Sequence, residues 1–206
     1  MIYFTSDLHF GHKNVLRMGN RPFADIEEMN AALITNWNRR VSDLDEVYIL
    51  GDISLAKNWK VVYEFLRPLH GKKYLIKGNH EHYLRDRKFL QHYFELITDY
   101  HELRYNEKHF ILSHYPFWEW NGKYRGSIHL YGHVHAGDSF FLQEYFGKCY
   151  CVGVESNAYT PVSIEEIIER MEKVPKTGLL DEFFQEHKVK VWNQAGKTEE
   201  REETTE

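Results

Sequence analysis

The stretch IYFTSDLH, residues 2–9, begins as a run of β-branched and aromatic residues and ends in a polar turn. Such a run predicts a buried strand, which stops where Asp7 and His9 flank Leu8. Aspartate and histidine side chains both bind divalent metals. The stretch therefore predicts a strand whose end carries two metal-binding side chains, and it prompts the question whether other strands end in the same way.

Four further predicted strands do so. They cover residues 46–50, 73–77, 109–113 and 127–131. The metal-binding residues that follow them are Asp52, Asn79, His114 and His133, with His135 two residues after the last. In an α/β fold, loops at one sheet edge converge while the strands hold them rigid. We therefore expect an α/β protein in which two aspartates, one asparagine and four histidines meet.

Helices are predicted between these strands. Residues 25–40 place apolar side chains at helical spacing behind the N-cap candidate Asp25, and residues 60–69 and 82–94 also have helical patterns. Ser163 and Glu166 have the spacing of a capping box that opens a further helix. We expect two more strands, around residues 139–146 and 149–155, in this aromatic and β-branched part of the chain.

Composition limits the possible functions. The chain has 206 residues and a formal net charge of −5, which gives no general reason to bind nucleic acid or an anionic membrane. It shows no secretory signal and no apolar run of about 18 residues. Cys149 and Cys151 are two apart, a poor arrangement for a disulfide within one strand, and we interpret them as free thiols. These features predict a cytoplasmic location and no membrane partner.

The side chains gathered at the strand ends favour a particular chemistry. Mixed nitrogen and oxygen ligands suit manganese, iron, zinc, cobalt or nickel better than magnesium or calcium. Two such ions about 4 Å apart lower the pKa of a bridging water and stabilise the attacking and leaving oxygens of an in-line displacement. The cluster therefore predicts two divalent ions, with manganese favoured, and a phosphate ester as substrate.

The motifs resemble those of a known family. The chain contains Asp7-Leu8-His9, Gly51-Asp52, Gly78-Asn79-His80-Glu81, His114 and Gly132-His133-Val134-His135, in the order of the motifs in calcineurin-like metallophosphoesterases. The opening motif is most similar to small stand-alone bacterial and phage phosphoesterases. The resemblance covers residues 1–171 and implies a four-layer α/β/β/α sandwich with two mixed β-sheets.

The resemblance also implies roles for these residues. One metal would be held by Asp7, His9, Asp52 and His135, and the other by Asp52, Asn79, His114 and His133. Asp52 is then shared, and a hydroxide bridging the metals attacks phosphorus in line. His80 would stabilise charge or protonate the leaving oxygen, so His80 and Asp52 are the predicted catalytic residues.

These roles predict a binuclear metal-dependent phosphodiesterase. The alternatives are a phosphomonoesterase acting on a small metabolite or nucleotide, and a metal-binding scaffold without turnover, against which His80 argues. Residues 51–56 lack the arginine-containing segment of protein serine/threonine phosphatases, so a phosphoprotein substrate is disfavoured.

Four further residues are candidate substrate contacts. His12 either reaches the site or caps a helix near Asn14, and Arg21 is either a phosphate contact or a solvated surface arginine. Tyr115 and Trp118 belong to an aromatic loop that either lines the substrate cleft, favouring nucleotide esters, or packs on the sheet. The expected partner is a small phosphoester or nucleotide. A nucleic-acid substrate is not indicated by net charge, and the protein is expected to be a monomer or homodimer.

The chain is predicted to contain one catalytic domain and two terminal segments. The metallophosphoesterase domain covers residues 1–175. Residues 176–195 contain an apolar stripe expected to dock on that domain. The charged and apolar-poor residues 196–206 are expected to be disordered.

Overall fold

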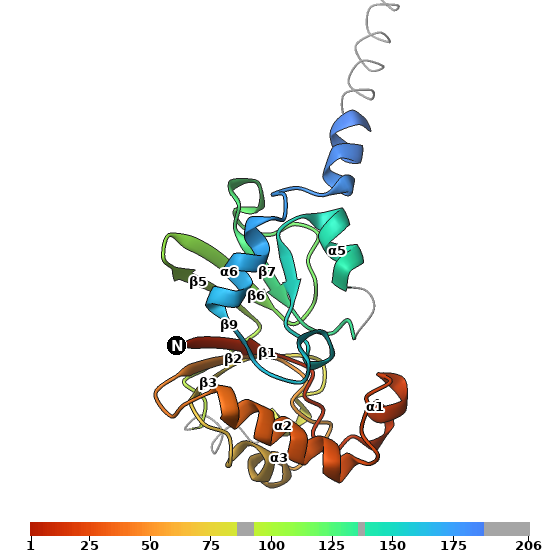
Figure 1. Cartoon of the computed structure of the whole chain (residues 1–206), viewed down its shortest axis with the longest axis vertical. Helices are drawn as coiled ribbons and strands as arrows, with labels where there is room; N and C mark the ends of the chain where they lie inside the picture. The colour runs from red at the N-terminus through yellow and green to blue at the C-terminus, as the bar shows by residue number, and fades with distance from the viewer. Residues whose placement is uncertain (86–92, 136–138, 188–206) are drawn as a thin grey trace, which may run out of the picture.

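The computed structural model describes residues 1–85, 93–135 and 139–187, and it contains two mixed β-sheets (Figure 1). The first sheet has the strand order β4-β3-β2-β1-β9, in which only β9 is antiparallel to its neighbour. Its strands are β1 (Ile2–Thr5), β2 (Glu46–Leu50), β3 (Lys72–Ile76), β4 (Leu96–Thr98) and β9 (Val162–Ser163).

The second sheet has the order β5-β6-β7-β8. β5 and β6 form an antiparallel hairpin, whereas β6, β7 and β8 run parallel. Its strands are β5 (Tyr100–Tyr105), β6 (Lys108–Ser113), β7 (Ile128–Tyr131) and β8 (Cys149–Cys151). The predicted α/β fold with two mixed sheets is therefore confirmed.

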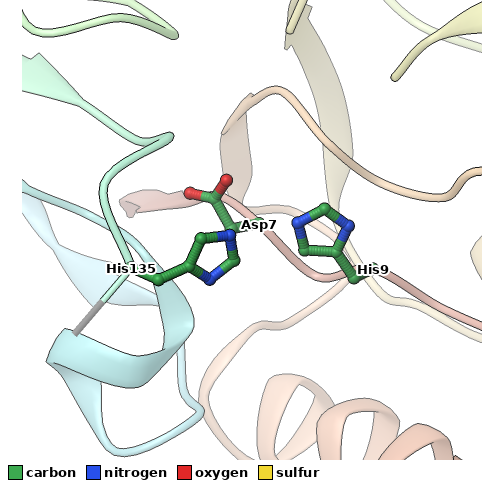
Figure 2. A group of neighbouring side chains, drawn as sticks. All are labelled: Asp7, His9 and His135. Carbon is green, nitrogen blue, oxygen red and sulfur yellow. The ribbon is translucent and has the colours of Figure 1, made fainter. Parts of the chain in front are cut away.

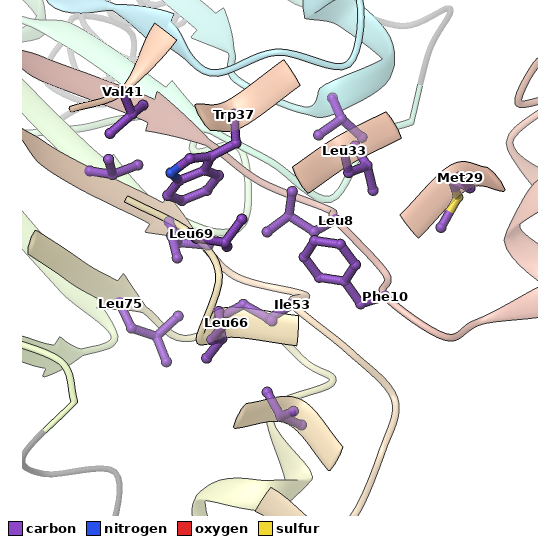
Figure 3. Packing of buried hydrophobic residues seen from close by; sticks show 14 of the residues in the cluster. Leu8, Phe10, Met29, Leu33, Trp37, Val41, Ile53, Leu66, Leu69 and Leu75 are labelled. Carbon is purple, nitrogen blue, oxygen red and sulfur yellow. The ribbon is translucent and has the colours of Figure 1, made fainter. Parts of the chain in front are cut away.

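Successive side chains of a strand point to opposite faces of the sheet, so each strand contributes to two cores. Val47 and Ile49 of β2 face a core shared with the helices, whereas Tyr48 and Leu50 face a second core between the two sheets. Figure 3 shows the first of these cores, where Trp37 and its neighbours pack beside the sheet. A third cluster covers the opposite face of the second sheet and includes Trp120. Both sheets are thus buried on two faces.

Helices cover these faces. Figure 1 shows α2 and α3 on the side of the first sheet that faces away from the second. The predicted cap at Asp25 accepts a hydrogen bond from the Glu28 N–H, and Ser163 and Glu166 form the predicted capping box. The α-helices are α1 (Lys13–Met18), α2 (Ile26–Arg40), α3 (Trp59–Leu66), α5 (Ser139–Phe146) and α6 (Ile164–Glu172). The 3₁₀ turns are η1 (His82–Arg85), η2 (Lys123–Arg125) and η3 (Val154–Asn157).

Two predicted elements differ from the structure. The strand expected at 139–146 is wrong, because these residues form helix α5. Leu142 and Phe146, four residues apart and so on one helix face, both pack against the third cluster. The strand expected at 149–155 ends at Cys151. Of the helix predicted at 82–94, residues 82–85 form the 3₁₀ turn η1, residues 93–94 are not helical, and residues 86–92 lie outside the described residues.

A helical segment at residues 179–187 follows the main domain. Asp181 at its start is buried and accepts a hydrogen bond from the buried Lys123 ammonium at 2.8 Å. The ring of Phe184 lies 4.7 Å, centroid to centroid, from that of Trp118. The beginning of the predicted docking segment therefore contacts the domain, while residues 188–206 lie outside the described part of the chain.

Two smaller expectations can also be compared with the structure. Cys149 and Cys151 are buried free thiols. Within the described residues, no helix combines the length and the apolar character needed to cross a membrane.

Candidate metal centre

The predicted ligands meet where β1, β2, β3, β6 and β7 end. They form two groups, each of which brings its ligand atoms within 4.8 Å of one another. The first ligand group is Asp7, His9 and His135, drawn in Figure 2. The second ligand group is Asp52, His114 and His133, to which we add Asn79 because its Oδ1 lies 3.0 Å from His114 Nε2.

Asp7 is held in a fixed orientation. Its Oδ2 accepts a hydrogen bond from the Ser6 hydroxyl at 2.6 Å and another from the His133 backbone N–H at 3.0 Å. Burial raises the pKa of Asp7 to about 6. A nearby divalent cation would favour the charged carboxylate and reverse that shift.

His9 offers the clearest test of whether a metal fits. Both of its ring nitrogens are buried, and neither has a hydrogen-bond partner among the described residues. Burial and the nearby Arg21 charge lower the pKa of His9 to about 2, so the imidazole is neutral. A neutral imidazole with an unused buried nitrogen is the form that binds a metal, and an ion there would satisfy an otherwise costly polar atom. The residues present therefore fit a divalent metal.

In the second ligand group, the orientation of His114 is fixed by the backbone. Its Nδ1 lies 2.8 Å from the carbonyl oxygen of Leu50, which can only accept, so Nδ1 carries the proton. Nε2 is then left with a free lone pair on the side of Asn79 and Asp52. Such a backbone contact is a usual way of orienting a metal-binding histidine.

Asp52, a member of the second ligand group, also lies close to the first. Its Oδ2 is 3.8 Å from His9 Nε2 and 3.6 Å from His114 Nε2. Its Oδ1 accepts a hydrogen bond from the His80 backbone N–H at 3.0 Å. One carboxylate oxygen is therefore within reach of a nitrogen from each group, as a shared ligand would be.

The backbone around the ligands is unusual. Asp7, His9, Asp52 and His133 all have left-handed φ angles, of 57°, 51°, 56° and 69°. Such conformations cost free energy in residues with a side chain and cluster at functional sites. At Gly132, an added Cβ would lie 2.4 Å from Ser6 Oγ and 2.6 Å from Asp7 Oδ2. Glycine is needed there so that the turn carrying His133 can approach Asp7.

Two of the remaining predicted residues lie beside the ligands. The His80 side chain is 31% exposed, with Nε2 3.8 Å from Asp52 Oδ2. His12 precedes α1 but makes no side-chain capping bond, and its ring lies 5.4 Å from that of His9. The structure therefore places both histidines near the ligand groups.

The other three candidate substrate contacts, Tyr115, Trp118 and Arg21, have different surroundings. The Tyr115 ring is 4.6 Å from that of His133, and its hydroxyl is 3.4 Å from Asn79 Oδ1. Trp118 instead lies against Phe184 of the C-terminal segment. Arg21 is buried, and its guanidinium is bonded to Glu155 and to backbone carbonyls. Of these three, Tyr115 contacts the side chains of a ligand group, Arg21 contacts the backbone carbonyl of Asp7, and Trp118 lies away from the ligands.

Two glutamates with buried side chains lie behind the site; Glu81 belongs to a predicted motif, but neither it nor Glu155 was a predicted site residue. Glu155 accepts a hydrogen bond from His135 Nδ1 at 2.7 Å. Glu81 accepts from the backbone N–H groups of Ile53 and Gly78, which neighbour Asp52 and Asn79. Glu155 ends a predicted strand at 149–155, so the strand-end rule that located the ligands could also have located it.

Comparisons with known proteins agree with this geometry. The family model for calcineurin-like phosphoesterases matches residues 1–192. An uncharacterized protein of Methanocaldococcus jannaschii is 38% identical over 175 residues, covering 84% of this chain and 92% of the relative. The gene 66 protein of Mycobacterium phage L5 is 31% identical over 160 residues, covering 65% and 77%. A solved structure, a protein of unknown function from Aquifex aeolicus, matches with a TM-score of 0.63 and 28% identity, covering 82% and 98%.

Proposed function

The chain belongs to the calcineurin-like phosphoesterase family and is a metal-dependent phosphoester hydrolase, and we propose that its substrates are phosphodiesters. Asp7, His9 and His135 hold one divalent ion in this proposal, and Asn79, His114 and His133 hold the other. Asp52 is shared between the ions. The nitrogen and oxygen donors of both groups suit manganese.

The position of Asp52 is the observation that carries the proposal. Its Oδ2 lies less than 4 Å from a nitrogen of each ligand group, so a single carboxylate can hold two ions side by side. When bound, a pair of divalent ions polarises phosphoryl oxygens and lowers the pKa of water. Around them, the chain's own residues have to orient the substrate and supply a proton to the leaving oxygen.

His80 is the residue that we propose for the proton transfer. It lies in the turn after Asn79, its backbone N–H is bonded to Asp52, and its partly exposed ring borders the centre. A histidine in hydrogen-bond reach of a leaving oxygen contributes about 10²–10⁴-fold to a hydrolysis. His80 therefore acts as the general acid in this proposal, without being a ligand.

The ion pair between Arg21 and Glu155 supports a diester substrate. A phosphomonoester carries close to two negative charges at neutral pH, whereas a diester carries one. The sequence left Arg21 as either a phosphate contact or a solvated surface arginine, but its side chain is buried and its charge is balanced by Glu155. It is therefore not available for the additional charge of a monoester.

Tyr115 supports a nucleotide ester within that class. Its ring is 46% exposed and lies beside His133. Stacking of a base on an exposed aromatic ring is worth roughly 1–3 kcal/mol. A base attached to a phosphate bound at the centre can stack there in a way that a simple alkyl phosphate cannot.

A chromogenic assay tests the function. The protein is freed of metal with a chelator, reloaded with Mn²⁺, and given bis-p-nitrophenyl phosphate or p-nitrophenyl phosphate. We expect metal-dependent release from both, with the higher kcat/KM for the diester. A higher value for the monoester would make the protein a phosphomonoesterase, and release from neither would indicate a metal-binding scaffold.

A screen of natural phosphoesters then tests the nucleotide preference. Cyclic nucleotides, 2′,3′-cyclic ends, nucleic acids and mononucleotides are compared under the same conditions. Equal kcat/KM for nucleotidyl and simple alkyl diesters would contradict a stacking role for Tyr115.

A further inference from the structure

A buried ion pair lies directly behind the first ligand group. Arg21 Nη2 is 2.6 Å from Glu155 Oε1, and Arg21 Nε donates to the same oxygen at 2.8 Å. The two side chains are 0% and 3% exposed. They are 134 residues apart in sequence, so the pair joins the loop after α1 to the turn after β8.

Glu155 fixes the orientation of His135. The His135 Nδ1 atom lies 2.7 Å from Glu155 Oε1, which can only accept when ionised, so Nδ1 carries the proton. The Nε2 atom then keeps its lone pair for a metal. A carboxylate bonded to the far nitrogen of a metal-binding histidine fixes its tautomer and raises its basicity.

Arg21 holds the backbone of the turn that carries the other two ligands, Asp7 and His9. Its Nη2 donates to the Asp7 carbonyl at 2.6 Å, and its Nη1 donates to the Leu8 carbonyl at 3.0 Å. These carbonyls belong to the turn in which Asp7 and His9 adopt left-handed φ angles. One guanidinium therefore contacts the turn that carries Asp7 and His9 and, through Glu155, the loop that carries His135.

The energetics of burial do not favour such a pair for stability alone. Removing two charges from water costs several kcal/mol per ion, and apolar residues of similar volume are often as stabilising. Glu155 is also not one of the side chains whose ligand atoms converge within 4.8 Å. Its contacts, to a cation and to one ligand histidine, are those of a residue that orients a ligand.

We propose that Arg21 and Glu155 are positioning residues that pre-orient Asp7, His9 and His135 for one of the two metal ions. The inference rests on the metal centre proposed above. In it, Arg21 and Glu155 stabilise the first ligand group and not the second. The second ligand group does not depend on it, because His114 is oriented by the Leu50 carbonyl.

The test compares two double variants. Arg21→Met with Glu155→Gln removes both charges together, so that no buried charge is left unpaired. The matched control is Lys123→Met with Asp181→Asn, which makes the same kind of change in the other buried pair, at 2.8 Å and with side chains 0% and 5% exposed. Circular dichroism and Tm establish that each variant is folded.

Metal binding is then measured without reference to activity. Wild type is expected to bind two Mn²⁺ per chain by elemental analysis and titration calorimetry. In the Arg21 and Glu155 variant we expect one of the two ions to bind about 10–100-fold more weakly. Its electron paramagnetic resonance spectrum should change from that of a coupled ion pair to that of an isolated Mn²⁺. The control variant should keep both ions and the coupled spectrum.

Three results would contradict the inference. A folded Arg21 and Glu155 variant that binds both ions with wild-type affinity would overturn it, and so would equal weakening in the control. If that variant does not fold, Arg21→Lys is measured instead, since lysine keeps the charge but has one donor nitrogen; wild-type affinity for both ions would then overturn the inference. A wild-type protein that binds fewer than two ions would instead refute the binuclear centre, which separates the two failures.

Discussion

Two buried glutamates support the metal centre, one behind each ligand group, and they have opposite electrostatic surroundings. Glu155 faces Arg21 and His135; burial opposes its charge, but these two partners outweigh burial and lower the pKa of the carboxyl. Glu81 has only backbone N–H donors and no cation partner among the described residues, and burial together with the Asp52 charge raises its pKa to about 7.

This difference shows two ways of building a rigid site. The first ligand group is held by a buried ion pair, which contacts the His135 side chain and the backbone of the turn that carries Asp7 and His9. The second is held through the backbone of the loops that carry Asp52 and Asn79, with no buried charge pair at Glu81 among the described residues. Substitutions at Glu155 and at Glu81 should therefore weaken the binding of different metal ions.

The largest effect is expected from Asp52→Asn, which affects both groups. The amide keeps the shape of the side chain but removes the shared negative charge, so both ions should be lost and activity should fall to background. Elemental analysis and turnover of bis-p-nitrophenyl phosphate check this. A variant that retains two Mn²⁺ per chain would show that Asp52 is not shared.

His80→Ala should leave metal binding by both ligand groups unchanged while it lowers the rate of hydrolysis. Both ions should remain, because His80 is not among the proposed ligands, and kcat should fall about 10²–10⁴-fold for a lost general acid. Metal analysis in parallel with steady-state kinetics measures both quantities. Loss of half the metal would make His80 a ligand of the second group and the assigned role wrong.

Glu81→Gln should produce a moderate effect confined to the second group. Glutamine has one acceptor oxygen, so either the Ile53 or the Gly78 N–H loses its partner, at a cost of about 1–3 kcal/mol. We expect a lower Tm and about 10-fold weaker binding of one Mn²⁺, without an orphaned buried charge. Calorimetric titration decides this, because equal weakening of both ions would show that the two supports are not separate.

The smallest effect on the metal centre is expected from substitutions in the aromatic loop that contains Tyr115 and Trp118, because this loop contacts neither Glu81 nor Glu155. Trp118→Ala should lower Tm by removing contacts with Phe146 and Phe184, while kcat/KM stays unchanged for every substrate. Tyr115→Ala should instead raise KM for a nucleotidyl diester about 10-fold and spare simple alkyl diesters, which have no ring to stack. If Trp118→Ala raised KM selectively and Tyr115→Ala did not, the substrate surface would lie on the other side of the loop.

Much of the site was predictable because its signals are local. Each ligand follows a short strand-like run, and the residue types that bind metals are few, so the sequence indicates both the edge of the sheet and its chemistry. The division into two groups came from the family resemblance, and the structure brings together Asp7, His9 and His135 in one group and Asp52, His114 and His133 in the other. Helix starts such as Asp25 were also predictable, since the side chain and the N–H that it accepts are three residues apart.

The parts that were not predictable depend on distant partners. Residues 139–146 contain aromatic residues with high strand propensity, but packing of Leu142 and Phe146 on the second sheet favours a helix. Arg21 gives no local sign that it is buried, because the carboxylate that pairs with it is 134 residues away. The sequence therefore left Arg21 as either a phosphate contact or a solvated surface arginine, whereas the structure buries it behind the first ligand group.

The left-handed backbone at Asp7, His9, Asp52 and His133 has a consequence for how this chain evolves. An ordinary side chain in that conformation costs roughly 1–2 kcal/mol, and glycine would avoid the cost. Random substitution at these four positions can thus make the protein more stable while destroying the metal centre. Selection for stability alone would erode the site, as expected where activity and stability are in conflict. Aspartate and histidine can persist at these positions only in a lineage that continues to need the reaction.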